Sequence, residues 1–285
     1  MRGFVVLITI RLKKSLIFFV AQSSFFVYLY PMNSGIHLID ASANGDTAVV
    51  AKLISTVDNP NIKDNSGSTA LMYAAYYGRY TIVEELCKHR EIDPNIQYDD
   101  GRTALILAAT KGHTKTVKKL LAHRRELDKN IQKEINPNIQ DKNGDTALNF
   151  AIYEGHEKIV KKLLEHKGIN PNVQNTTGNT PLICAIYKDR DCAVDALLRH
   201  PEINLKMQNK ESKTALDFAI RDKKVDIIKY LANAQKLNQL TIPTNSVFLS
   251  LEQDDHNNSV TMDLLNALLH NVVVLCSFHM LEKFV

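Results

Sequence analysis

One short pattern occurs five times in this chain and limits its fold more than any other feature. The pattern is a turn followed by Thr, then Ala or Pro, then Leu, as in Gly67-Ser68-Thr69-Ala70-Leu71. Its threonine recurs at intervals of 34, 43, 34 and 34 residues. A period of this size is typical of arrays in which small helical units stack on one another. The sequence therefore predicts a helical array with a signature threonine in each clear unit, at Thr69, Thr103, Thr146, Thr180 and Thr214.

Each unit predicts a pair of short helices. Thr69 can cap the first helix through its hydroxyl group, and Leu71 and Ala74 give that helix a thin apolar face. Ile82 and Leu86 give the second helix an apolar stripe at the spacing of one buried side. Isolated helices shorter than roughly 12 to 15 residues are only marginally stable. We therefore expect each pair to depend on stacking against its neighbours.

The full unit resembles the ankyrin repeat. It begins with a Gly-containing turn and Thr-Ala/Pro-Leu, followed by a pair of small residues. In most copies a second glycine comes next, and a Val or Ile then precedes Leu-Leu. An asparagine-bearing tail such as Asp93-Pro94-Asn95-Ile96-Gln97 follows. Five copies are clear, residues 36–61 form a degenerate sixth at the front, and the resemblance covers residues 36–236. It implies an all-α fold, an ankyrin-repeat solenoid of stacked helix-turn-helix units with short β-hairpin loops.

The chain departs from the family pattern at two kinds of position. The His that commonly follows Thr-Pro-Leu is absent, and we expect this to remove a polar link between units. Asp189 and Lys223 stand where the fourth and fifth copies would carry a turn glycine, so we expect the C-terminal repeats to be the looser ones. The residues at the position of the missing His are Met72, Ile106, Asn149, Ile183 and Asp217.

The 43-residue interval contains an insertion. Residues 127–132 are followed by a near copy at 135–140. An insertion in a repeat often lies on the binding face. A duplication without function fits equally well, because surface loops lengthen at little entropic cost.

The sequence divides into four segments, with the array in the second. Residues 1–31 are an apolar leader or a spurious N-terminal extension, residues 32–237 the array of about six repeats, residues 238–258 a linker, and residues 259–285 an apolar C-terminal helix. Within residues 4–30, basic residues before an apolar run resemble a signal peptide or a membrane anchor. Alternatively, translation begins at Met32. The C-terminal helix is expected to fold against the end of the array or to dock on a partner.

Charge and cysteine content exclude some classes of protein. The net charge of +4 comes entirely from residues 1–31, which carry four basic residues and no acidic ones, so the remainder is neutral. We therefore expect no nucleic acid partner. Four cysteines without paired spacing fit free thiols in a reducing compartment, with Cys87 and Cys184 at core positions.

No catalytic motif is present. The sequence lacks GxGxxG, a phosphate-binding Gly-Lys-Ser/Thr loop, HExxH and GxSxG. We therefore predict a protein that is not an enzyme and has no catalytic residue, cofactor or metal. His89, His123, His166 and His200 recur at the end of each second helix. Neighbouring helices pack about 8–10 Å apart, too far for a shared zinc ion, so we expect these histidines to stabilise helix C-termini.

The resemblance places the binding surface at two kinds of position. In ankyrin proteins the two residues before the glycine that ends the first helix face a concave groove, and residues at the hairpin tips extend it. Exposed tyrosines there would be good interface anchors. Packing of some of these tyrosines against neighbouring repeats is the alternative. The predicted groove residues are Tyr76, Tyr77, Thr110, Lys111, Tyr153, Glu154, Tyr187, Lys188, Arg221 and Asp222, and the predicted tip residues are Asp100, Arg102, Asn143, Asp145 and Asn179.

The sequence thus favours a monomeric, non-enzymatic interaction scaffold that binds a protein partner through this groove and these tips. The alternative is a membrane-anchored ankyrin protein, tethered through residues 4–30 or through the C-terminal helix, in which the array is a spacer or a secreted effector module. The array is similar to ankyrin proteins of intracellular bacteria. The resemblance implies a location in the cytoplasm or, after secretion, in a host cell.

Overall fold

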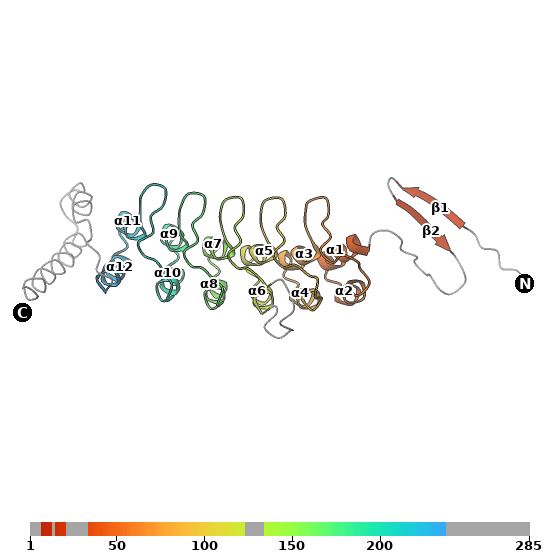
Figure 1. The fold of residues 1–285 in the computed structure, drawn as a ribbon, viewed down its shortest axis with the longest axis horizontal. Helices are drawn as coiled ribbons and strands as arrows, with labels where there is room; N and C mark the ends of the chain where they lie inside the picture. Colours follow the sequence, from red (N-terminus) through yellow and green to blue (C-terminus); the bar gives the residue numbers. More distant parts are fainter. Residues whose placement is uncertain (1–6, 13–14, 21–33, 123–133, 238–285) are drawn as a thin grey trace, which may run out of the picture. The chain divides into compact units, whose positions relative to one another are not determined.

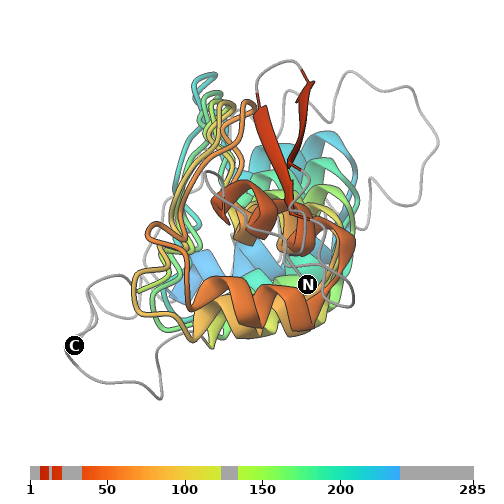
Figure 2. The same cartoon turned by 90° about the vertical axis from the view of Figure 1, so that its right-hand side faces the viewer.

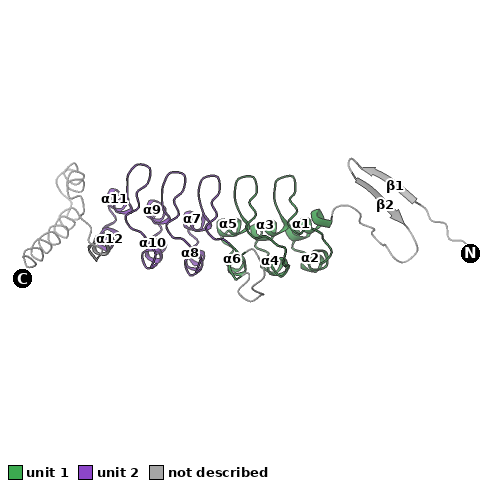
Figure 3. Cartoon of the chain, viewed as in Figure 1, with its two compact units in different colours: residues 1–135 green, residues 136–285 purple. Residues whose placement is uncertain are grey.

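A computed structural model of the chain describes residues 7–12, 15–20, 34–122 and 134–237, with side chains over 34–122 and 134–231. Its contacts divide the chain into two compact units, residues 1–135 and 136–285 (Figure 3). The boundary between the units falls within the 43-residue interval.

The first unit contains three helix pairs. The first helices of successive pairs contact each other in one row, and the second helices contact each other in a second row (Figure 1). Figure 2 shows the two rows as separate layers, with the connecting loops beside them. The helices are α1 (Ser34–Asn44), α2 (Thr47–Ile54), α3 (Ala70–Tyr76), α4 (Tyr80–Cys87), α5 (Ala104–Thr110) and α6 (Thr114–Leu121).

The first unit also contains a β-hairpin that the sequence analysis did not predict. Strand β1 (Leu7–Leu12) pairs antiparallel with β2 (Ser15–Val20), with Leu7 opposite Val20. This segment had been interpreted as a leader or an anchor. Its β-branched and aromatic residues also favour strands. Among the residues with a described structure, no helix is long and apolar enough to cross a membrane.

The second unit repeats the same two-row arrangement. Helix α9 contacts both α7 and α11 in the row of first helices, and α10 contacts α8 in the other row. The helices are α7 (Ala147–Tyr153), α8 (Glu157–Leu164), α9 (Pro181–Tyr187), α10 (Asp191–Leu198), α11 (Ala215–Arg221) and α12 (Val225–Leu237).

The signature threonines begin the first helices as predicted. Each has extended backbone, and its hydroxyl oxygen accepts the backbone N–H three residues later, which satisfies one of the unpaired donors of the first turn. The small residues that follow are fully buried, including Ala74, Ala108, Ala151 and Ala185. This thin face allows neighbouring first helices to pack closely.

The position of the missing family His is partly compensated. Asn149 and Asp217 accept hydrogen bonds from the backbone N–H and the hydroxyl of Thr146 and Thr214, respectively, and so complete capping boxes. The amide of the fully buried Asn149 also donates to Cys184 Sγ at 3.7 Å. The predicted loss of a polar link between repeats was therefore wrong at Asn149.

In several repeats an asparagine in the tail joins that repeat to the next one. In the first unit, Asn61 Nδ2 donates to the Glu91 carbonyl at 2.6 Å, while its Oδ1 accepts the Asp93 N–H at 2.8 Å. In the second unit, Asn138 and Asn172 make the same pair of bonds 30 and 32 residues ahead. We call these bonds the asparagine ladder.

A glutamine ladder runs beside it in the second unit. Gln140 Nε2 donates to the carbonyl of Gly144 in its own hairpin and to that of Gln174 in the next one. Gln174 repeats the pattern toward Gly178 and Gln208. The hairpin loops of this unit are therefore held in a fixed register.

Several predictions concern residues without a described structure. They are the copy at 127–132 within the insertion, the linker at 238–258 and the apolar helix at 259–285.

The two positions without a turn glycine do adopt a glycine-like conformation. Asp189 and Lys223 both have φ of 54°, in the left-handed region, where the corresponding Gly78 has φ of 69°. A side chain with a Cβ atom in this region costs about 1–2 kcal/mol. The backbone is therefore strained at both residues.

Lys223→Gly is expected to raise the free energy of unfolding by about 1 kcal/mol, because relief of strain exceeds the added entropy of the unfolded chain. Lys223→Ala is the matched control, since it removes the same side chain but keeps the Cβ atom. It should change the free energy by less than about 0.5 kcal/mol. Urea unfolding followed by circular dichroism measures both. An equal gain from Ala and Gly would contradict the backbone explanation.

Candidate interaction surfaces

The predicted groove residues lie where the first helices end. Those in the first unit, Tyr76, Tyr77, Thr110 and Lys111, are called the first face. Those in the second unit, called the second face, are Tyr153, Glu154, Tyr187, Lys188, Arg221 and Asp222. On the first face Tyr76 is 38% exposed and Tyr77 48% exposed.

The rings of the first face are held in a defined arrangement. The Tyr76 and Tyr77 rings meet edge to face with centroids 5.0 Å apart, and Tyr73 stacks on Tyr77 at 6.4 Å. Lys111 Nζ lies 4.7 Å from the centroid of the Tyr76 ring. Thr110 differs from these residues, because its hydroxyl donates to the Ile106 carbonyl of its own helix at 2.8 Å.

The first face opens into a hollow of about 270 Å³. The predicted groove supplies only part of its lining, since Tyr73 and Tyr98 were not predicted. Tyr98 occupies the repeat position at which the preceding repeat has Asp64. This replacement of an acidic residue by a tyrosine was the sequence signal that could have identified Tyr98. The lining residues are Ser68, Met72, Tyr73, Tyr76, Tyr77, Tyr98 and Leu107.

The second face combines exposed charges with one prominent ring. Tyr187 is 58% exposed and lies 5.5 Å from Lys188 Nζ and 5.7 Å from the guanidinium carbon of Arg221. Arg221 also forms a two-point ion pair with Asp222, at 2.7 and 2.9 Å. This pairing lowers the pKa of the Asp222 carboxyl and raises that of Arg221.

Tyr153 does not present its hydroxyl on the surface. This hydroxyl donates to Asp145 Oδ1 at 2.8 Å and lies 3.2 Å from Cys184 Sγ. Asn175 Nδ2 donates to both Asp145 and Tyr153. Burial is the largest cause that raises the pKa of Tyr153, and burial also raises the pKa of the Cys184 thiol to about 11. The structure thus places Tyr153 and the buried Asp145 in a polar network between repeats, where the sequence analysis expected an exposed groove and an exposed tip.

The other predicted tip residues are only partly available. Asp100 accepts a hydrogen bond from the Tyr98 hydroxyl at 2.5 Å and forms an ion pair with Arg102 at 3.3 Å. Asn179 Oδ1 accepts a hydrogen bond from Asn209 Nδ2. The Asn143 side chain is exposed, while its backbone carbonyl accepts the Thr176 N–H of the next hairpin.

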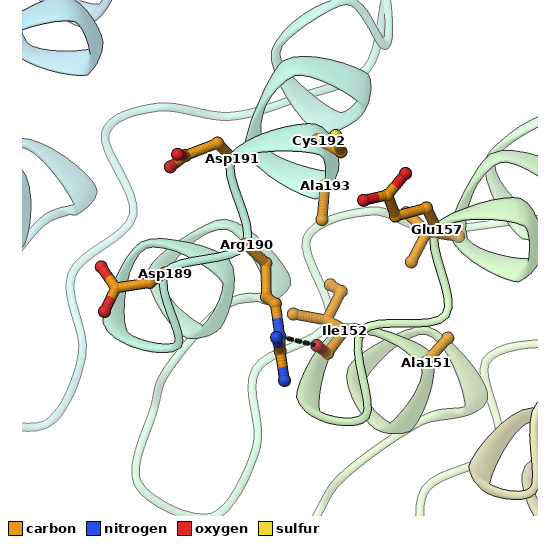
Figure 4. Close-up of a pocket in the computed structure, with 10 residues that line it drawn as sticks. Ala151, Ile152, Glu157, Asp189, Arg190, Asp191, Cys192 and Ala193 are labelled. Atoms are coloured by element: carbon orange, nitrogen blue, oxygen red, sulfur yellow. Dashed lines mark hydrogen bonds between the residues drawn. The ribbon is translucent and has the colours of Figure 1, made fainter.

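A pocket on the second unit lies between the turns after α7 and α9 (Figure 4). The guanidinium of Arg190, which lines this pocket, donates to the carbonyls of Ile152 and Tyr153. It therefore links the turn of one repeat to the next repeat. A hydrogen bond with Glu157 is the main cause that raises the pKa of the exposed Cys192, the opposite of what activates a thiol nucleophile. We therefore assign this pocket a packing role.

The recurring histidines have a structural role. Nδ1 of His89, His166 and His200 accepts the backbone N–H two residues later, which fixes the turn after each second helix. This local bond explains the recurrence of histidine at this position better than the helix dipole that the sequence analysis invoked. His123 lies outside the described residues. In the part of the chain that the structure describes, no three His, Cys, Asp or Glu side chains are arranged to hold a metal ion.

Fold and surface together define a helical-repeat protein that carries exposed tyrosines where the first helices α3 and α9 end. The chain belongs to the ankyrin repeat family. A family model described as "Ankyrin repeats (3 copies)" matches residues 38–133, 91–175, 126–207 and 167–241. Ankyrin repeats generally act as protein–protein interaction modules, and the predicted fold class is confirmed.

Solved structures of ankyrin proteins share the fold. The ankyrin repeat domain of Bcl-3, of the IkappaB protein family, is 22% identical with a TM-score of 0.61, over 69% of this chain and 84% of that one. The ankyrin repeat protein EF0377 is 25% identical with a TM-score of 0.60, over 71% and 98%. An ankyrin repeat domain (ABAYE2397) from Acinetobacter baumannii AYE is 26% identical with a TM-score of 0.60, over 70% and 97%. A search of curated proteins gives no match.

Tyr153→Phe is expected to lower the free energy of unfolding by about 2 kcal/mol, because it removes the hydroxyl that donates to the buried Asp145 carboxylate. Tyr187→Phe removes an exposed hydroxyl and serves as the control, with a change below about 0.5 kcal/mol. Urea unfolding of both variants makes the comparison. Equal stabilities would show that the Tyr153 network does not contribute to folding.

Proposed function

We propose that the protein is a non-enzymatic scaffold that binds a protein partner through the first face, the second face and the adjoining hairpin tips. The observation that carries this proposal is the exposure of Tyr76, Tyr77 and Tyr187 at the ends of helices whose opposite sides are buried. A tyrosine ring buries a large area on binding, while its hydroxyl keeps a hydrogen bond. Tyrosine is accordingly enriched at interfaces and among the residues that dominate binding energy.

The rigidity of these faces also supports binding. The threonine caps hold the first helices, and the asparagine ladder couples successive repeats. Side chains mounted on such elements lose little conformational freedom when a partner docks, so less of the contact energy is spent on ordering.

The charges favour a protein over a nucleic acid. The second face balances Lys188 and Arg221 with Glu154 and Asp222, and Arg221 is already paired with Asp222. Nucleic acids bind to protein surfaces with an excess of cationic side chains, because these side chains displace the counterions condensed on the phosphate backbone. A mixed surface with exposed rings suits the polar and aromatic surface of another protein. The predicted location, in the cytoplasm or in a host cell after secretion, and the predicted monomeric state stay predictions of the sequence.

The test is to replace Tyr76, Tyr77 and Tyr187 by Ala together, leaving Tyr153 in place because its hydroxyl belongs to the fold. Affinity capture with the full chain supplies the partner, and calorimetry measures its Kd. The triple variant should lose about 2 kcal/mol or more of binding free energy.

The matched control combines Tyr80→Ala and Tyr230→Ala. These tyrosines are 38% and 45% exposed but lie on the second helices α4 and α12, so the control should keep the partner within about 0.5 kcal/mol. Thermal unfolding must show that both variants stay folded. Undiminished binding by a folded triple variant would reject the faces as the binding surface and would favour the alternative, in which the array is a spacer.

A further inference from the structure

Four of the seven residues that line the hollow of the first face are tyrosines. Tyr73, Tyr76 and Tyr77 come from the end of α3, and Tyr98 comes from the hairpin of the next repeat. The aliphatic members of the lining contribute little accessible surface, because Met72 is 2% exposed and Leu107 is 9% exposed. A ligand in the hollow would therefore meet aromatic rings and their hydroxyls.

Two of these rings are made more electron-rich by carboxylates. The Tyr73 hydroxyl donates to Asp64 Oδ2 at 2.8 Å, and the Tyr98 hydroxyl donates to Asp100 Oδ2 at 2.5 Å. A phenol that donates to an anion carries more negative charge over its ring. The face of an aromatic ring attracts cations through its quadrupole, and these bonds strengthen that attraction.

A cation of the chain itself already lies at the edge of the hollow. Lys111 Nζ is 4.7 Å from the centroid of the Tyr76 ring, within the distance of about 6 Å at which such attraction operates. The Tyr76 ring is thus accessible to a positive group, and Lys111 competes for it with any cation that enters from outside.

The rim of the hollow carries carboxylates that can pair with a cation. Helix α3 has no charged residue, and the two hairpins beside it contribute Asp64, Asp99 and Asp100. Their cations already have partners, since Lys63 donates to the Gln97 carbonyl and Arg102 is paired with Asp100. Asp99 lies against the hairpin of the preceding repeat, since a Cβ atom on Gly67 would fall 2.8 Å from its Oδ1. Ser68, which follows Gly67 in the sequence, lines the hollow.

We propose that this hollow binds an arginine side chain carried by a basic segment of the partner protein. An arginine fits because its planar, weakly hydrated guanidinium stacks on aromatic faces and also pairs with carboxylates. A hydrophobic anchor would find little aliphatic surface, and an acidic one would meet the carboxylates of Asp64 and Asp100, which already accept the tyrosine hydroxyls. The inference rests on the proposed function and specifies the chemistry recognised by the first face.

The test uses the full chain and capped peptides of sequence Gly-Ser-Gly-X-Gly-Ser-Gly, in which X is arginine, lysine or citrulline. Citrulline keeps the shape of arginine but has no charge. Binding is followed by NMR of isotope-labelled tyrosine rings. The arginine peptide should shift the ring signals saturably, lysine should bind more weakly, and citrulline should bind about tenfold more weakly or worse.

Variants of the chain identify the site. Tyr76→Ala should weaken the arginine peptide about fivefold or more, and Lys111→Ala should strengthen it by removing the competing cation. Tyr80→Ala is the matched control, because Tyr80 is also 38% exposed and has Lys115 Nζ 5.1 Å from its ring, yet does not line the hollow. It should leave the affinity unchanged. Thermal unfolding checks that each variant is folded.

Equal binding of citrulline and arginine, or equal losses from Tyr76→Ala and Tyr80→Ala, would overturn the inference. The two proposals fail separately. If the captured partner needs the exposed tyrosines but not its own arginines, the arginine assignment is wrong while the scaffold function stands. If it binds the triple tyrosine variant undiminished, the scaffold proposal fails whatever the peptides do.

Discussion

The structure depends on the coupling of each helix pair to the next. Each short helix is too small to be stable alone, so the array needs contacts that repeat with the period of the sequence. Buried alanines supply close packing in the row of first helices, and the asparagine ladder adds directional bonds. Asn61, Asn138 and Asn172 each satisfy one carbonyl and one N–H in the following repeat, and Asn95 donates to the Glu134 carbonyl. At about 1 kcal/mol for each bond, these links contribute appreciably to a marginally stable fold.

The same coupling produces the exposed faces. The first helices turn their small residues toward neighbouring helices. The residues at their C-terminal ends do not take part in this packing, and their type differs from repeat to repeat. Tyr76 and Tyr187 occupy equivalent positions and are both exposed. Tyr153 occupies that position too, but Asp145 and Cys184 bind its hydroxyl. One position of the repeat can therefore be exposed or be tied into the fold, depending on side chains 8 and 31 residues away.

This dependence explains what the sequence could and could not predict. The helix pairs, the threonine caps and the buried Cys87 and Cys184 follow from a pattern repeated in register, so they were predictable. The network around Tyr153 was not, because it depends on the particular neighbours Asp145 and Asn175. The four-tyrosine hollow was only half predicted, since family positions indicate Tyr76 and Tyr77 but give no reason to choose Tyr73 or Tyr98. The strands at residues 7–12 and 15–20 were missed because their apolar character was interpreted as that of a leader.

The central claim is that repeats are stabilised by their neighbours through these links. Native-state hydrogen exchange tests it most directly at the backbone amides of Asp93, Asn170 and Asn204, which donate to ladder asparagines from turns near the surface. The account predicts that each amide exchanges only when the adjoining helix pairs open, with the same opening free energy and denaturant dependence as those helices. Fast exchange of these amides, independent of denaturant while the helices remain protected, would contradict it.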